Sequence, residues 1–162
     1  MRTDELAGTA LDYWCARALC ANDEGTLYFT AVDPRVILTS ACDALRRLDA
    51  HFAPSASWAD AGAVLERVGE LRIARCDDGV ECDACFIDGP STWAARAPDA
   101  RTALLRAFVR ARFGDEVDTP PSFAHRIEHG AAVRYDPGVP IPEADDDSAT
   151  GDSSDIRSIP RM

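Results

Sequence analysis

Residues 98–114 carry the clearest secondary-structure signal in the chain and read PDARTALLRAFVRARFG. Apolar side chains recur in this segment at four-residue spacing, so they lie on one face of a helix. Pro98 suits the first turn of that helix, and Gly114 follows where a C-terminal cap belongs. The segment therefore predicts a long amphipathic helix over residues 98–112. The apolar pairs are Leu104 with Phe108 and Leu105 with Val109.

Short β-rich segments precede this helix and predict antiparallel hairpins. The turn sequence Asp77-Asp78-Gly79 is typical of a tight hairpin, and Asp33-Pro34 also favours a turn. Thr92-Trp93-Ala94-Ala95-Arg96 predicts one more strand. The strands expected on either side of the two turns are residues 71–76 with 80–87 and residues 26–32 with 35–39.

Further helical patterns surround the hairpins. A Ser followed three residues later by Asp marks two helix starts, at Ser40 and at Ser57. Helices and hairpins without βαβ alternation predict an α+β fold, in which a small antiparallel sheet of hairpins is packed by three to four helices. The helices expected besides residues 98–112 are 8–20, 41–52 and 58–67. Residues 122–130, bounded by Ser122 and Gly130, could add one or two helical turns.

Charge divides the 162-residue chain into two parts. It has 28 acidic and 17 basic residues, for a net charge of −11. Residues 136–162 carry −5 of this charge, are rich in proline and serine, and contain the run Asp145-Asp146-Asp147. Such a segment cannot bury enough apolar surface to offset its ordering entropy. We therefore expect one domain over residues 1–135, followed by a disordered acidic tail.

The basic residues of the chain are all arginines. Without lysine, a P-loop, a pyridoxal phosphate enzyme and a serine–lysine acylase are excluded. Arg101, Arg106, Arg110 and Arg112 line the long helix and could clamp an anion bidentately. Since every surface cation must be arginine here, we favour a solvated face instead. The acidic net charge argues against non-specific binding to duplex DNA.

The N-terminal sequence and the apolar runs bear on location. No apolar run approaches the roughly 20 residues that a membrane helix requires. Asp4 and Glu5 stand where a signal peptide carries positive charge. We therefore expect a cytoplasmic protein in a bacterial host cell, with its six cysteines reduced and no membrane contact.

Three segments of the chain carry a resemblance to a known family. They are ELAGTALDYWCA at 5–16, FAPSASWADAGAVLER at 52–67, and ALLRAFV at 103–109 with FGDEVD at 113–118 and Pro120. In this order they resemble the NinX-like family of small phage and prophage proteins. Two positions depart from the family's central pattern: Ala56-Ser57 replaces Thr-Asp before Trp58, and Ala61 replaces one glycine. The resemblance covers about half of the chain and implies a phage or prophage setting without implying a reaction.

The central segment of this resemblance supplies the candidate binding site. Trp58 stands at a predicted helix N-terminus, where free N–H groups attract anions and the indole offers a stacking surface. The alternative is that Trp58 only packs the helix onto the core. Because no catalytic set is evident, we expect a non-enzymatic accessory protein that binds a host or phage protein or a small anionic, nucleotide-like ligand, in host takeover or anti-defence. The candidate site residues are Pro54, Ser55, Trp58, Gly62, Asp115 and Glu116.

Two alternatives involve metal. Cys76, Cys82 and Cys85 could supply three thiolates to a structural zinc ion, although residues 82 and 85 of a straight strand point to opposite faces. His125-Arg-Ile-Glu128-His129 matches the H-x-x-E-H pattern of a metal-dependent hydrolase, provided that a helix brings the two histidines together. We expect no cofactor, with zinc as the alternative. The sequence leaves a homo-oligomer open.

Overall fold

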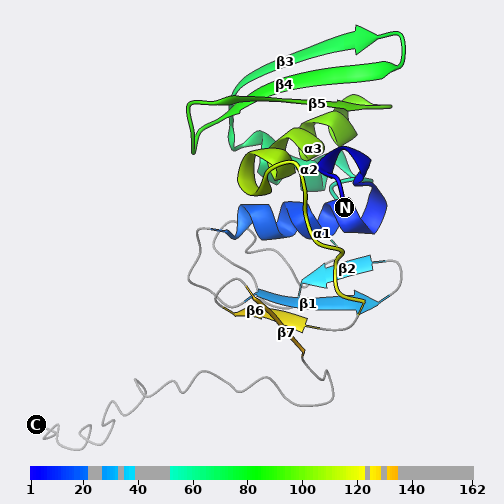
Figure 1. Ribbon diagram of the computed structural model, residues 1–162, viewed down its shortest axis with the longest axis vertical. Coiled ribbons are helices and arrows are strands. Elements are labelled where there is room, and N and C mark those ends of the chain that lie inside the picture. Colours follow the sequence, from blue (N-terminus) through cyan, green and yellow to red (C-terminus); the bar gives the residue numbers. More distant parts are fainter. Residues whose placement is uncertain (22–26, 33–34, 39–51, 123–124, 129–130, 135–162) are drawn as a thin grey trace, which may run out of the picture.

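The computed structural model describes residues 1–21, 27–32, 35–38, 52–122, 125–128 and 131–134. Its elements form four layers (Figure 1): a three-stranded sheet, the helices α2 and α3, the helix α1, and a four-stranded sheet. This is the α+β fold that the sequence predicts, with the hairpins divided between two antiparallel sheets. In chain order the elements are η1 (Thr3–Glu5), α1 (Gly8–Leu19), β1 (Leu27–Val32), β2 (Arg35–Leu38), α2 (Trp58–Leu65), β3 (Val68–Cys76), β4 (Gly79–Phe86), β5 (Thr92–Ala97), α3 (Ala100–Phe113), β6 (His125–Glu128) and β7 (Ala131–Arg134).

Helix α3 confirms the long helix predicted from the sequence. Asp99 is its N-cap and accepts hydrogen bonds from the Thr102 N–H at 3.0 Å and the Thr102 hydroxyl at 2.7 Å. Burial alone would raise the pKa of Asp99, but these hydrogen bonds and the nearby Arg101 lower it below its usual value. Gly114 ends the helix at a φ of 86°, a conformation that glycine adopts without strain. Pro98 stands just outside the helix, before the N-cap.

The three-stranded sheet covers α3 with one face. Its order is β3-β4-β5, and both pairings are antiparallel. Along β4, Cys82, Ala84 and Phe86 are buried while the residues between them are partly exposed. Phe86 packs on Phe108 of α3 with ring centroids 5.1 Å apart. The alternation shows that one face of β4 forms the core and the other faces solvent.

Helix α1 lies between α3 and the four-stranded sheet (Figure 1). Eight of its twelve residues are buried, because neighbouring layers cover it on more than one side. Leu11, Cys15 and Ala16 are fully buried, and Trp14 packs edge-on against Phe113 at the end of α3. The four-stranded sheet has the order β2-β1-β6-β7, so β1 pairs with its sequence neighbour β2 and with the distant β6.

One helical segment suggested by the sequence is wrong. Residues 122–130 could have formed one or two helical turns, but His125–Glu128 forms β6 and pairs with β1 and β7. The pairing of Ile127 with Leu27 joins segments 100 positions apart, which local sequence patterns do not reveal. The helix predicted over 41–52 lies outside the described residues except for its last residue, the buried Phe52. The tail expected from residue 136 onward also lies outside them.

The cysteines differ in part from the expectation of six reduced thiols. Cys20, the C-cap of α1, is disulfide-bonded. Cys15, Cys76, Cys82 and Cys85 are free. No helix in the described part of the chain is long and apolar enough to cross a membrane.

Candidate functional site

The predicted site residues Pro54 and Ser55 are anchored to α1. Pro54 is fully buried. The Asp12 carboxylate, only 6% exposed, accepts hydrogen bonds from the Ser55 N–H at 2.7 Å and the Ser55 hydroxyl at 3.0 Å. Two segments of the family resemblance therefore meet at this contact. Pro54 and Ser55 fix the entry into α2, and of the two only Ser55 is partly exposed.

The start of α2 is fixed by two further hydrogen bonds. The Ser57 hydroxyl accepts from the Asp60 N–H at 3.4 Å, as the predicted capping pattern requires. The Asp60 carboxylate accepts from the Ala53 N–H at 3.0 Å, so it holds the preceding turn rather than closing a capping box. These contacts orient Trp58, the first residue of the helix, on a rigid backbone.

Trp58 lies on an exposed apolar face of α2. Its side chain is 48% exposed, and Leu65, seven positions later on the same face, is 37% exposed. Gly62 stands between them, and a Cβ there would meet nothing within 4 Å. From α3, the Arg101 guanidinium lies over the Trp58 ring, 5.8 Å from its centroid. We call Trp58, Gly62, Leu65 and Arg101 the α2 surface.

Two residues of the α2 surface, Trp58 and Gly62, were among the site residues predicted from the sequence. Leu65 was missed, although its seven-residue spacing from Trp58 places both on one helical face. The neighbouring position of Arg101 depends on the packing of α2 against α3, which the sequence does not give.

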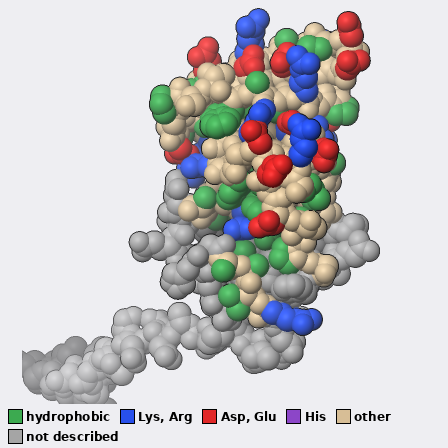
Figure 2. Space-filling view, viewed as in Figure 1, with side chains coloured by type: hydrophobic (Ala, Val, Ile, Leu, Met, Phe, Trp, Pro, Cys, Tyr) green, Lys and Arg blue, Asp and Glu red, His purple; other side chains and the backbone are tan. Residues whose placement is uncertain are grey.

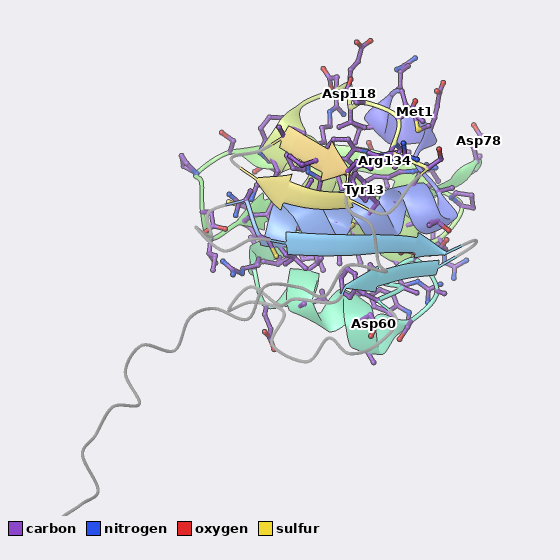
Figure 3. All side chains as sticks on the ribbon, turned by 90° about the horizontal axis from the view of Figure 1, so that it is seen from below. Met1, Tyr13, Asp60, Asp78, Asp118 and Arg134 are labelled. Carbon is purple, nitrogen blue, oxygen red and sulfur yellow. The ribbon has the colours of Figure 1, made fainter. Side chains whose placement is uncertain are left out.

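Asp115 and Glu116, the remaining predicted site residues, lie away from the α2 surface. Asp115 pairs with Arg110 at 2.5 Å, and its backbone carbonyl accepts from the Thr3 N–H at 2.9 Å. Glu116 forms a β-bridge with Arg2. Figure 3 shows Asp60 of α2 on one side of α1 and Met1 and Asp118 on the other. The structure therefore does not bring the six predicted residues together.

Glu116 contributes to an open pocket of about 390 Å³. The Arg17 guanidinium lies 4.7 Å from the Trp14 ring centroid, and the Trp14 indole N–H donates to the Asp118 carbonyl at 3.1 Å. The lining thus combines one arginine, Arg17, with two acidic residues, Glu116 and Asp118. The mixed charge does not select for an anion. The lining residues are Met1, Trp14, Arg17, Phe113, Glu116, Val117 and Asp118.

Three of the four arginines of α3 contact other protein groups rather than gathering as an anion clamp. Arg106 donates to the Leu6 and Arg96 carbonyls, both at 2.9 Å, and Arg110 donates to the Ala94 carbonyl at 2.9 Å. Arg112 pairs with Asp88. Figure 2 shows positive and negative side chains interspersed over the visible face. The sequence favoured a solvated face for the arginines of this helix. In the structure, Arg106, Arg110 and Arg112 contact other parts of the protein instead.

The three cysteines of the zinc alternative do not converge. Cys82 is buried against α3, Cys85 faces the other side of β4, and Cys76 is exposed at the end of β3. Burial, with a smaller effect of Asp83, raises the pKa of Cys82 to about 11, which disfavours the thiolate that zinc binds. Within the described residues, no group of three potential ligand side chains could hold a metal ion.

The histidine alternative loses its geometric basis. His125 and Glu128 are the first and last residues of β6, and His129 lies outside the described residues. The histidine hypothesis required a helix over this segment, and residues 125–128 form an extended strand instead, with a rise of about 3.3 Å per residue.

A protein-family model matches the part of the chain that contains the contact between Asp12 and Ser55. No curated protein sequence matches the chain. The family model described as "Bacteriophage P22, NinX" matches residues 2–112, well over half of the chain. That range includes α1, the Pro54–Ser55 turn, α2, the three-stranded sheet and nearly all of α3. The chain therefore belongs to the phage NinX family.

Proposed function

We propose that this phage protein is a non-enzymatic binding module that engages a host or phage protein through the α2 surface. The observation that carries the proposal is the half-exposed Trp58 beside Arg101. Tryptophan and arginine are the residue types that most often dominate protein–protein binding energy. When a partner covers a half-exposed indole, the burial of its apolar surface makes the free energy of binding more favourable.

The rigid support of α2 strengthens this proposal. Hydrogen bonds from Ser55 to the buried Asp12, and from Ala53 to Asp60, fix the helix start before any partner arrives. Binding then orders few additional groups, which lowers its entropic cost. Gly62 leaves a shallow space between Trp58 and Leu65 that a partner side chain could fill.

A protein partner is favoured over the small anionic ligand that the sequence also allowed. The pocket that Glu116 helps to line has two acidic residues and one arginine, Arg17, and this excess of negative charge disfavours an anion. The partner belongs to the infected cell, where the binding would serve host takeover or evasion of defence.

The experiment compares partner capture by the wild-type chain and by Trp58→Ala. Tagged full-length proteins are incubated with host lysate, and captured proteins are quantified by mass spectrometry. We expect Trp58→Ala to reduce capture of the partner at least tenfold, the scale of a hot-spot residue, because the central apolar contact is removed. The affinity of the purified partner is then measured directly for both proteins.

Ile87→Ala is the matched control. Ile87 is 62% exposed and lies just after β4, so its truncation removes exposed apolar side-chain surface that is not part of the α2 surface. It should retain wild-type capture. A partner captured equally well by wild type and a folded Trp58→Ala variant would refute the α2 surface as the binding site.

A further inference from the structure

The two edge strands of the three-stranded sheet, β3 and β5, differ in whether other groups bind their outer backbone atoms. At the β5 edge, Arg106 donates to the Arg96 carbonyl and Arg110 to the Ala94 carbonyl, both at 2.9 Å. These side chains reach up from α3 and occupy outward-facing backbone acceptors. They satisfy backbone groups that an added strand would otherwise bind, so this edge is closed to further pairing.

The β3 edge is open in the described structure. β3 is the terminal strand of its sheet, and Figure 1 shows it on the outside of the molecule. It is nine residues long, and eight of these residues are exposed. No described element hydrogen-bonds to its outer edge. A long exposed edge is a template for another strand.

Apolar side chains on β3 add a second observation. Leu71 and Ile73 pair with Ala84 and Cys82, which are buried on the helix-facing side of the sheet. Residues that pair directly across a sheet share a face, so Leu71 and Ile73 also face the helix layer. They are nevertheless 37% and 46% exposed, because the described helices cover them incompletely.

We propose that a second copy of this chain occupies the β3 edge, with the two β3 strands antiparallel about a two-fold axis at Leu71. The two sheets then join into one six-stranded sheet. The backbone groups of both edges are satisfied, and the partly exposed Leu71 side chains meet on the helix-facing side.

Charge complementarity selects a second copy and this register. With Leu71 opposite Leu71, Glu70 of each copy stands opposite Arg72 of the other, on the outer face of the sheet. Two cross-strand ion pairs result, because the two-fold axis repeats the contact. Moving the axis to Arg72 places two like charges opposite each other and is disfavoured. The irregular pairing around Gly69, between Val68 and Glu70, limits the ladder to residues 69–73.

Charge reversal tests both the dimer and its register. The full-length chain should be a dimer by light scattering and sedimentation, with dissociation on dilution. Glu70→Arg and Arg72→Glu should each weaken the dimer about tenfold, because each replaces two attractive pairs with two repulsive ones. The double variant, Glu70→Arg with Arg72→Glu, restores the pairs and should return the wild-type dissociation constant.

The controls separate loss of pairing from loss of fold. Asp78→Arg makes the same kind of charge reversal in the β3–β4 turn, outside the ladder, and should leave the dimer intact. Melting temperatures are compared for all variants, since Arg72 also stands opposite Asp83 within one copy. A monomer at every concentration, unaffected single variants, or a double variant that stays dissociated would each overturn the proposal.

A cross-linking measurement provides an independent test. With Cys76 changed to serine, Leu71→Cys places two thiols opposite each other at the axis, within reach of a short bis-maleimide. Ile73→Cys places its two thiols about four residues apart along the strands, roughly 13 Å. Cross-linked dimer should form efficiently with Leu71→Cys and much less with Ile73→Cys. Equal yields from the two variants would contradict the register.

Discussion

Asp12 is the residue that joins the family's first segment to its second. Its carboxylate is buried and accepts two hydrogen bonds from Ser55, one from the backbone and one from the side chain. Hydrogen bonds to a buried charged acceptor are stronger than neutral ones. The aspartate and the serine in these segments are therefore explained by packing between α1 and the turn before α2.

Removing the Asp12 carboxylate should destabilise the fold. Asp12→Ala leaves the Ser55 N–H and hydroxyl without their acceptor, so we expect the free energy of unfolding to fall by about 2–3 kcal/mol. Urea denaturation followed by circular dichroism measures this change. Asp4→Ala is the control, because the ion pair of Asp4 with Arg2 is exposed and its loss should cost less than about 1 kcal/mol. Equal losses in the two variants would argue against the Asp12 contact.

At the scale of elements, the β3–β4 turn and α2 use glycine for different reasons. Gly79 begins β4 at a φ of 142°, and a Cβ there would lie 2.4 Å from the Ala97 carbonyl oxygen. Gly62 lies inside α2, where a Cβ would meet nothing within 4 Å. Gly79 is therefore required by close backbone packing, whereas Gly62 is not required by the fold.

Alanine substitutions at the two glycines should have opposite effects. Gly79→Ala should lower the free energy of unfolding by about 2 kcal/mol or more, because the backbone is strained and the Ala97 carbonyl must move. Gly62→Ala should raise it by about 0.5–1 kcal/mol, since alanine is the better helix former. Thermal and urea unfolding of both variants check these signs. A stable Gly79→Ala protein would show that the turn can rearrange.

Elements with local signals were predictable, and those that depend on distant pairing were not. The capping residues Ser57 and Asp99 each accept a hydrogen bond from the backbone N–H three residues later. The starts of α2 and α3 therefore depend on residues that are close together in the sequence. β6 was mistaken for a helix because Ser122 and Gly130 resemble helix ends. Its pairing with β1 overrides that local pattern, since strand pairing depends on partners far away in the chain.

At the scale of the whole molecule, α1 and α3 form a central double layer between two sheets (Figure 1). Six consecutive or near-consecutive residues of α3 are buried, whereas three of the four residues of β7 are exposed. Regional stability follows buried apolar contact, so opening α3 requires more of the structure to unfold than opening β7.

Hydrogen exchange should reveal this gradient. We expect the backbone amides of α3 and β4 to exchange slowest, at rates set by global unfolding, and those of β7 to exchange orders of magnitude faster. Mass spectrometry or NMR on the full-length chain measures both. Protection of β7 equal to that of α3 would mean that the four-stranded sheet opens only with the whole fold.

The sequence by itself determined the long helix, the hairpins of β1–β2 and β3–β4, the caps Ser57 and Gly114, and the α+β class. These follow from side-chain periodicity and turn chemistry, which act over a few neighbouring residues. Only the tertiary structure decided which functional candidates share a surface. It placed Trp58 beside Arg101, buried Pro54 and hydrogen-bonded Ser55 to Asp12. It also placed Glu116 in a pocket that the α2 surface does not line, and it left the β3 edge open while arginines occupy acceptors at the β5 edge. The physical reason is that exposure and contact depend on how layers pack, and packing is a property of residues distant in the chain.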